Sequence, residues 1–118
     1  MSGAKNFVML MRLHCEKVVS KVHGKTYADW VQDENLRDAV CMRLLSLAES
    51  IKKYLDVCPT LVETYPDIPW SEIVRFRDKV AHHCAGIDFD LVWQIVETDI
   101  PPLSRVIDEL LTRENHSL

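Results

Sequence analysis

The chain has 118 residues, of which 47% are hydrophobic and 27% are charged, and this balance is typical of one globular domain with a single core. We therefore predict one domain over residues 1–118. The formal net charge of −4 disfavours a protein that coats nucleic acid through bulk electrostatics, although it is compatible with a local basic site. Only three glycines occur, which disfavours a β-rich fold with many tight turns.

The N-terminal region does not have the pattern of a secretory signal, because Lys5, Arg12 and Glu16 interrupt its apolar residues. No apolar stretch reaches the length that crosses a bilayer. The cysteines are widely spaced and include no C-x-x-C pair: Cys15, Cys41, Cys58 and Cys84. We therefore expect a cytoplasmic protein without membrane contact, whose cysteines are free thiols that pack as small hydrophobic groups.

The first half of the chain predicts two long helices with a short helical turn between them. Apolar residues recur at helical spacing over residues 5–22, and Gly24 then stands where a helix C-cap prefers glycine. Thr26 is placed to cap the short turn, and Asp33 is placed to cap the longest helix. Pro59 marks the end of that helix, because proline cannot continue it.

The second half predicts further helices after a link that contains two prolines. A short apolar turn at residues 61–62 leads into this link, and the prolines fix the direction of the helix predicted for residues 70–82. The loop around Gly86 ends that helix, Asp88 can cap the next segment, and Asp99 precedes the last one. Four main helices with short links and extra helical turns predict an all-α, up-and-down four-helix bundle.

The longest predicted helix has two different faces. Its apolar stripe supplies the predicted core residues Leu36, Val40, Leu44, Leu47, Ile51, Tyr54 and Leu55. The other face is interpreted as an ordinary solvated face and carries Arg37, Glu49, Lys52 and Lys53, with Glu49 and Lys53 as an i,i+4 pair. Arg43 borders the apolar stripe, from which it either reaches a functional cleft or extends into solvent.

The densest cluster of ionisable residues lies between residues 75 and 84. It comprises three basic side chains, two imidazoles and one acid: Arg75, Arg77, Lys79, His82, His83 and Asp78. In a chain that is acidic as a whole, such a local basic cluster suits the capture of one phosphodiester better than the tracking of a long backbone.

Within this cluster, Arg77 and His82 are the pair that could carry chemistry. A separation of five residues turns two side chains more than about 90° apart on an ideal helix, so the pair does not share one face. One cleft could still collect both side chains if the helix loosens before Gly86. Alternatively, two copies of the chain could meet across a two-fold axis and place both pairs around one substrate.

Chemically, the pair suits cleavage of RNA without a metal. A neutral imidazole can take the proton of a ribose 2′-hydroxyl, because its pKa lies near working pH. A guanidinium can hold the scissile phosphate and the charge that grows on it in the transition state. The spacing alone is a weak signal, because many helices contain it by chance. On the spacing alone, the favoured interpretation of Arg77 is an ordinary surface salt-bridge residue.

Other assignments of the polar and aromatic residues are weaker. A zinc site that adds His14 and Cys15 to the cluster is disfavoured, because adjacent residues on a helix point in different directions. Cys84 as a catalytic thiol has no base other than the neighbouring histidines. We therefore expect no metal and no cofactor. Three aromatic residues that could stack on bases are assigned to the core instead: Tyr54, Trp70 and Trp93.

Several short segments follow one another in a distinctive order. They are Asp67-Ile-Pro-Trp70, Arg77-Asp-Lys-Val-Ala-His82, Gly86-Ile-Asp88, Val92-Trp93 and Asp99-Ile-Pro101. This order resembles the HepT-like branch of the HEPN superfamily, which typically shows Pro-x-Ile-Pro-Trp, Arg-Asn-x-hydrophobic-x-His, Ile-Asp, Val-Trp and Leu-Pro. Further matches at residues 27–33, 38–40 and 47–50 extend the resemblance over most of the chain; the family tends to carry Gly-Glu-Ala near the last of these.

The resemblance implies a homodimeric, metal-independent endoribonuclease that acts as the toxin of a toxin–antitoxin pair. Its partner would be a minimal nucleotidyltransferase, which in this family neutralises the toxin by attaching AMP to a tyrosine. Arg77 and His82 match the family's catalytic arginine and histidine. The remaining members of the cluster are assigned to RNA binding or to support of the site: Arg75, Asp78, Lys79 and His83.

Two positions depart from the family pattern. Asp78 stands where the family favours asparagine, and Cys84 stands where the tyrosine that receives AMP is expected. Cys84 offers no hydroxyl for that transfer. Two functional hypotheses therefore remain: a ribonuclease toxin that uses Arg77 and His82, and a non-catalytic HEPN module that binds a nucleotidyltransferase and a nucleotide or RNA end.

Overall fold

The computed structural model describes residues 3–82 and 86–116, and these residues form helices and short connections without any strand. The helices are α1 (Gly3–Val22), α2 (Tyr27–Gln32), α3 (Glu34–Val57), α4 (Leu61–Thr64), α5 (Trp70–His82), α6 (Phe89–Thr98) and α7 (Ile100–His116). Within those two ranges, every helix is too short or too polar to cross a lipid bilayer.

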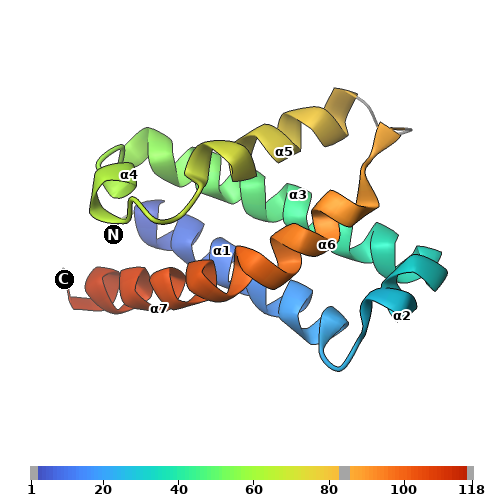
Figure 1. Ribbon diagram of the computed structural model, residues 1–118. Helices are drawn as coiled ribbons and strands as arrows, with labels where there is room; N and C mark the ends of the chain where they lie inside the picture. The colour runs from blue at the N-terminus through green and yellow to red at the C-terminus, as the bar shows by residue number, and fades with distance from the viewer. Residues whose placement is uncertain (1–2, 83–85, 117–118) are drawn as a thin grey trace.

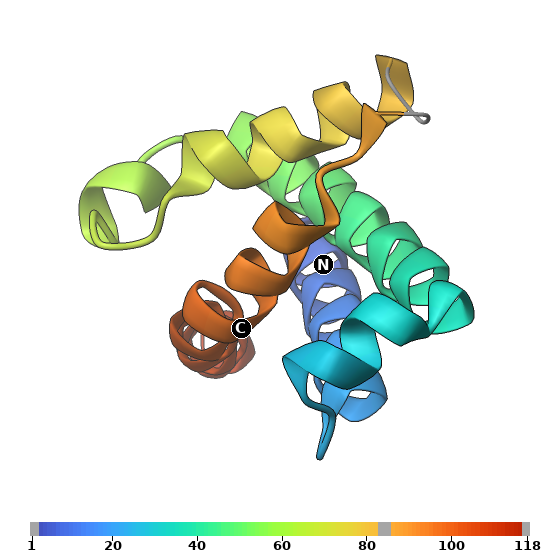
Figure 2. The same ribbon diagram turned by 45° about the vertical axis from the view of Figure 1, so that its right-hand side comes forward.

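Successive long helices run in alternating directions, as Figure 1 shows. α1 packs against α3 and α7, and α3 also packs against α5, so α1 and α3 form the middle of the bundle. α5 and α7 lie at opposite edges in both Figure 1 and Figure 2. α6 leads into α7 after Asp99 alone, and the two helices together form the fourth layer of the bundle, in which α7 packs against α1 (Figure 1). The predicted all-α, up-and-down arrangement with short additional helices is confirmed.

Side-chain caps fix where several helices begin, at the residues that the sequence predicts. Thr26 Oγ1 accepts a hydrogen bond from the backbone N–H of Asp29 at 3.2 Å, and the Asp29 carboxylate accepts one from the backbone N–H of Thr26 at 2.9 Å. Asp33 and Asp88 accept hydrogen bonds from the first-turn N–H groups of α3 and α6 in the same manner. Gly24 follows α1 with φ of 74°, a left-handed conformation that glycine adopts without strain.

One hydrophobic cluster runs through the middle of the bundle. Its fully buried members include Val8, Met11, Val18, Leu47, Ile51, Leu103 and Ile107, from α1, α3 and α7. Trp30 fastens α2 to the start of α6, because its Nε1 donates to the Phe89 carbonyl at 2.8 Å and its ring lies 5.4 Å from that of Trp93. Tyr54, Trp70 and Trp93 are buried, which confirms their assignment to the core.

The described cysteines are free thiols, as the sequence predicts. Cys15 and Cys41 are buried in the core and Cys58 is half-buried. Burial raises the pKa of both Cys15 and Cys41 to about 11, so these thiols are neutral and pack as small hydrophobic groups. Cys84 lies outside the described residues.

Candidate active site

α5 carries the cluster that the sequence singles out, and the link before it determines where this helix lies. Trp70 Nε1 donates to the Tyr65 carbonyl at 2.9 Å, and the Ile73 N–H donates to the Pro69 carbonyl at 3.1 Å. These bonds tie the proline-containing link to the first turn of α5. Ile73 and Phe76 are buried, and α5 packs against α3 through this apolar side.

Arg77 reaches from α5 to α3 and forms two ion pairs. Its Nε donates to Glu49 Oε2 at 2.7 Å, and its Nη1 donates to Asp78 Oδ1 at 3.0 Å. The hydrogen bond to Asp78 and the charge of Glu49 raise the pKa of Arg77, so the guanidinium is cationic at any working pH. Within the described residues, its Nη2 has no hydrogen-bond partner. Two carboxylates thus hold the cation, through its Nε and its Nη1.

A hollow lies between α1, α3 and α5 beside this ion pair, and we call it the Arg77 hollow. It has a volume of about 440 Å³ and is lined by His14, Leu45, Ser46, Glu49, Ser50 and Arg77. Ser50 is buried, and its Oγ donates to the Ser46 carbonyl at 3.0 Å. The hollow therefore brings a guanidinium, a carboxylate and an imidazole together from three helices.

His14 enters the Arg77 hollow from α1 and is held by Arg43 of α3. Arg43 Nη1 lies 3.3 Å from His14 Nδ1. Because a guanidinium can only donate, Nδ1 accepts, and the proton of the neutral ring is on Nε2. Burial and the charge of Arg43 lower the pKa of His14, which favours this neutral form. Arg43 thus contacts His14, which lines the hollow, whereas Arg43 is not itself among the lining residues.

Arg75 does not join Arg77. It is exposed and lines a separate hollow, together with Asp78 and the link before α5. Asp78 thus lies between the two arginines along the helix surface and pairs with Arg77. Of the predicted site residues, Arg77 and Asp78 are therefore in contact, whereas Arg75 lines the separate hollow beside the proline-containing link. In the described residues, the charge of Arg77 is balanced by two carboxylates, which a purely basic pocket would not have.

His82 and Lys79 belong to α5, but their side chains lie outside the described part of the structure. His83 and Cys84 lie outside the described residues altogether. The backbone of α5 stays helical through His82, so positions 77 and 82 are rotated by about 140° about the helix axis. In the described ranges, no three His, Cys, Asp or Glu side chains are grouped to hold a metal ion.

The interpretation of Glu49 as a solvated partner of Lys53 is wrong. Glu49 is half-buried and pairs with Arg77, 28 residues further along the chain. An exposed i,i+4 pair is worth only about 0.3–0.5 kcal/mol, so a carboxylate that a neighbouring helix partly covers prefers the cation on that helix. The available signal was the place of Glu49 within residues 47–50, one of the segments of the family resemblance.

The assignment of Arg37 to an ordinary solvated face is also wrong. Its Nη1 donates to the carbonyl oxygens of Trp30 and Val31, and its guanidinium lies 5.1 Å from the centre of the Phe89 ring. These contacts give hydrogen-bond donors to two carbonyl groups in the last turn of α2, and they cover the ring of Phe89. Arg37 therefore has a structural role away from the Arg77 hollow.

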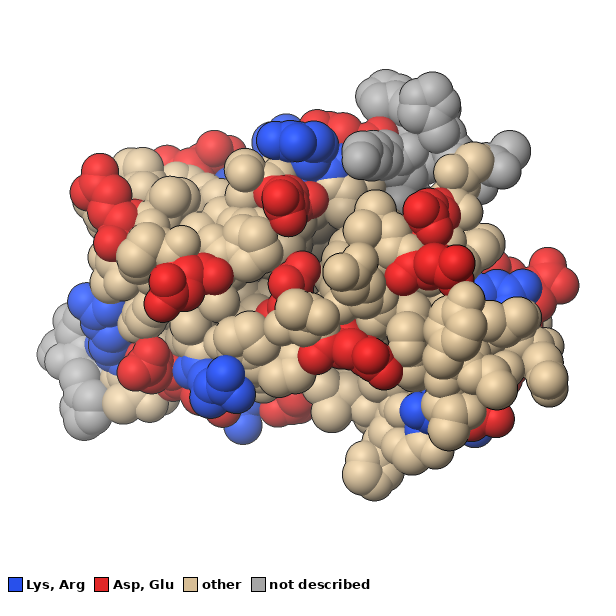
Figure 3. Space-filling view, in the orientation of Figure 1, with Lys and Arg blue, Asp and Glu red and all other residues tan. Residues whose placement is uncertain are grey.

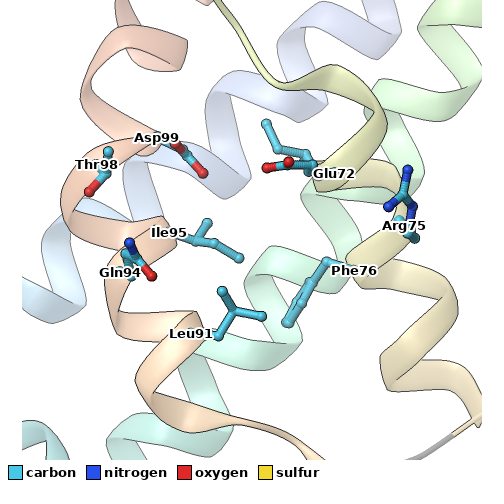
Figure 4. Close-up of a pocket in the computed structure, with 9 residues that line it drawn as sticks. Glu72, Arg75, Phe76, Leu91, Gln94, Ile95, Thr98 and Asp99 are labelled. Atoms are coloured by element: carbon cyan, nitrogen blue, oxygen red, sulfur yellow. The ribbon is translucent and has the colours of Figure 1, made fainter.

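Figure 4 shows another hollow, between α5 and α6, with a volume of about 350 Å³. Glu72 and Asp99 face each other across it, whereas Arg75 points away (Figure 4). Burial and the charge of Glu72 raise the pKa of Asp99. The surrounding face carries scattered acidic side chains and few basic ones, as Figure 3 shows. Two facing carboxylates repel a phosphodiester, so the Arg77 hollow is the better candidate for a site that binds one.

Comparison with known proteins identifies the family of the chain. Residues 11–110 match the family model described as Ribonuclease HepT-like. The chain belongs to the HepT-like ribonuclease family. The resemblance to the HepT-like branch of the HEPN superfamily is thereby confirmed, and the matched range contains the whole of α5 with Arg77 and His82.

Several relatives of this HepT-like chain cover most of its length. A candidate RNase of Caldanaerobacter subterraneus subsp. tengcongensis is 29% identical over 100 residues, which are 85% of this chain and 87% of that protein. A candidate RNase of Methanocaldococcus jannaschii is 27% identical over 94 residues, 80% of this chain and 75% of that protein. A candidate ribonuclease HepT of Thermococcus cleftensis is 31% identical over 84 residues, 71% of this chain and 74% of that protein. No solved structure matches the chain significantly. Membership of the HepT-like family and the names of these relatives support a ribonuclease function.

Proposed function

We propose that this HepT-like chain is a metal-independent endoribonuclease that acts as the toxin of a toxin–antitoxin pair, with a minimal nucleotidyltransferase as its antitoxin. Arg77 and His82 are the proposed catalytic residues. The observation that carries the proposal is the hydrogen bonding of Arg77: Glu49 and Asp78 accept from its Nε and Nη1. Among the residues that the structure describes, Nη2 has no such partner, and we assign it to a phosphate. A guanidinium fixed in this way stabilises developing charge without reorganisation during the reaction.

The proposed reaction is an internal transfer within the RNA. His82 takes the proton of the 2′-hydroxyl, and the 2′-oxygen then attacks the adjacent phosphorus. The bond from phosphorus to the 5′-oxygen breaks, and the leaving oxygen takes up a proton from an imidazolium or from water. The products are a 2′,3′-cyclic phosphate and a 5′-hydroxyl end. Arg77 stabilises the charge that builds on the phosphoryl oxygens.

A second copy of the chain completes the site in this proposal. Positions 77 and 82 of one α5 are rotated by about 140° about the helix axis, and this separation motivates a site that is shared between two copies. A two-fold axis close to α5 lets Arg77 of one copy meet His82 of the other. The regular helix up to His82 supports this arrangement over one in which the helix loosens.

A non-catalytic module that binds a nucleotidyltransferase is the second candidate function. Two observations favour it. Glu49 and Asp78 place two negative charges against the guanidinium that should bind a phosphate. In addition, Cys84 replaces the tyrosine that the family resemblance makes the acceptor of AMP, so control of this chain would rest on binding.

Cleavage of RNA by purified protein tests the proposal. We expect the wild-type chain to cut RNA in the presence of EDTA and to leave DNA of the same sequence intact, because the 2′-hydroxyl is the nucleophile. Arg77→Ala and His82→Ala should each lower the rate on the order of 10²–10⁴-fold. His83→Ala, next along the chain, is the matched control and should cost much less.

The outcomes separate the two candidates. A well-folded wild-type chain that binds its nucleotidyltransferase partner but never cuts RNA would reject the enzyme and favour the binding module. Cleavage that persists in the His82→Ala protein would show that another group is the base. In cells, growth arrest on induction of the wild-type chain, relieved by co-expression of the nucleotidyltransferase, would support the toxin role.

A further inference from the structure

We propose that the Arg77 hollow binds a ribose–phosphate unit of the RNA substrate, and that His14 contacts this unit as a neutral hydrogen-bond donor. The inference rests on the proposed ribonuclease function and adds a substrate-binding residue from α1, far in sequence from the Arg77–His82 pair. Its basis is the arrangement of His14, Glu49 and Arg77 around one hollow.

The size and lining of the Arg77 hollow fit one such unit. Its volume of about 440 Å³ falls within the range of roughly 300–1,000 Å³ that is usual for small-molecule sites. Arg77 lies at one side of the hollow with Nη2 unpaired within the described residues, which suits a phosphoryl oxygen. Leu45 adds an apolar part to the lining, against which a sugar ring can pack.

Glu49 distinguishes a ribose–phosphate from a free inorganic anion. Its carboxylate lines the same hollow and would repel a small ion with several negative charges. A phosphodiester carries only one negative charge, and a ribose hydroxyl next to it can donate a hydrogen bond to a carboxylate oxygen. Glu49 is thus placed to accept from the sugar while Arg77 receives the phosphate.

The hydrogen bonding of His14 determines what it can do. Arg43 donates to Nδ1, so Nε2 carries the ring proton and is a donor only. Such an imidazole cannot take a proton from the substrate through Nε2, which excludes the role of general base in this state. It can donate to a neutral sugar oxygen of the unit, and we expect that contact to be equally strong in the ground state and the transition state.

Kinetic analysis of His14 variants tests the inference. Loss of one neutral hydrogen bond is worth about 0.5–1.5 kcal/mol, so His14→Ala should raise KM roughly 2- to 12-fold with kcat nearly unchanged. His14→Gln retains a neutral N–H donor and should recover much of the lost affinity. The control is His23→Ala, an exposed histidine just after α1, which should change neither parameter. Circular dichroism of each variant confirms that it is folded.

Direct binding separates this inference from the proposed function. In a His82→Ala background, which blocks cleavage, the dissociation constant for an RNA oligonucleotide should rise by the same factor on addition of His14→Ala. If wild-type protein cuts RNA and neither His14 variant alters KM or binding, the inference is wrong and the proposed function stands. A loss of kcat on the order of 100-fold at constant KM would also overturn it, because His14 would then act in the chemical step. Wild-type protein that neither cuts nor binds RNA would reject both.

Discussion

The Arg77–Glu49 pair orients a functional group more than it stabilises the fold. The side chains of Arg77 and Glu49 are 32% and 37% exposed, and ion pairs that are accessible to water contribute little to stability. The pair nevertheless fixes the guanidinium over the hollow between α1, α3 and α5. A guanidinium that is already in place loses less conformational entropy when it binds a phosphate.

His14 makes the stability of the protein depend on pH. Its pKa lies below the ordinary value of 6.5 because of burial and the charge of Arg43, so the unfolded chain binds the proton more tightly than the folded chain. The contribution of neutral His14 to the free energy of unfolding is therefore fully present above pH 6.5, and it is lost as the pH falls through the lowered pKa of His14. We predict that wild-type protein loses more unfolding free energy between pH 7.5 and pH 5.5 than His14→Gln does.

Urea unfolding at the two pH values measures this difference. His23→Gln is the matched control, since His23 is exposed, and it should lose as much stability as the wild type. Equal losses for wild type and His14→Gln would contradict the description of His14 as a histidine kept neutral by its surroundings.

For single residues, the sequence indicates which side chains are functional candidates, but it does not indicate which residues they contact. The basic cluster and the family resemblance point to Arg77 from the sequence alone. Glu49 and Arg37 are misassigned, because their partners lie on other helices: Arg77 is 28 residues from Glu49, and the carbonyl of Trp30 belongs to α2. Helical periodicity reports which face is apolar, and it does not report which polar residue meets a neighbouring helix.

At the level of elements, α3 depends on a well-formed N-cap. Asp33 Oδ1 accepts the Leu36 N–H at 3.0 Å, and the side chain adds negative charge where the helix dipole favours it. We predict that Asp33→Ala lowers the unfolding free energy by about 1 kcal/mol, within the range of roughly 0.5–2 kcal/mol for lost caps. Thermal or urea denaturation of the purified variant measures this change.

Asp56 provides an opposite test on the same helix. It is exposed in the last turn of α3, where the helix dipole disfavours a negative charge. Asp56→Ala should therefore leave stability unchanged or increase it by a few tenths of a kcal/mol. If both variants lose the same stability, the effect at position 33 is not one of capping.

The helices were predictable because their ends carry local chemistry. Thr26, Asp33 and Asp88 cap where the sequence places caps, and α5 spans residues 70–82 as predicted. The role of α2 was not predictable to the same degree. Trp30 is fully buried because Phe89 and Trp93 cover it, and both lie about sixty residues away, beyond the reach of any local pattern.

For the whole molecule, the central prediction is a dimer. Each chain of 13.7 kDa supplies one Arg77 and one His82, and α5 holds these positions on different sides. We predict that light scattering at micromolar concentration gives a mass of twice 13.7 kDa. α5 should lie near the two-fold axis, so Arg75→Glu, which reverses an exposed charge on that helix, should weaken association more than Lys52→Glu on α3. A monomer at these concentrations would count heavily against a shared site.

Mixing two inactive variants tests most directly whether Arg77 and His82 form a ribonuclease site between copies. Arg77→Ala and His82→Ala chains are combined, allowed to exchange subunits, and assayed for RNA cleavage, with differently tagged chains to follow the exchange. Random exchange makes about half of the dimers mixed, and each mixed dimer joins one intact Arg77 to one intact His82 from different copies. We predict a clear return of activity, to between about a quarter and a half of the wild-type rate. A fully exchanged mixture as inactive as either variant alone, alongside an active wild-type protein, would contradict the account.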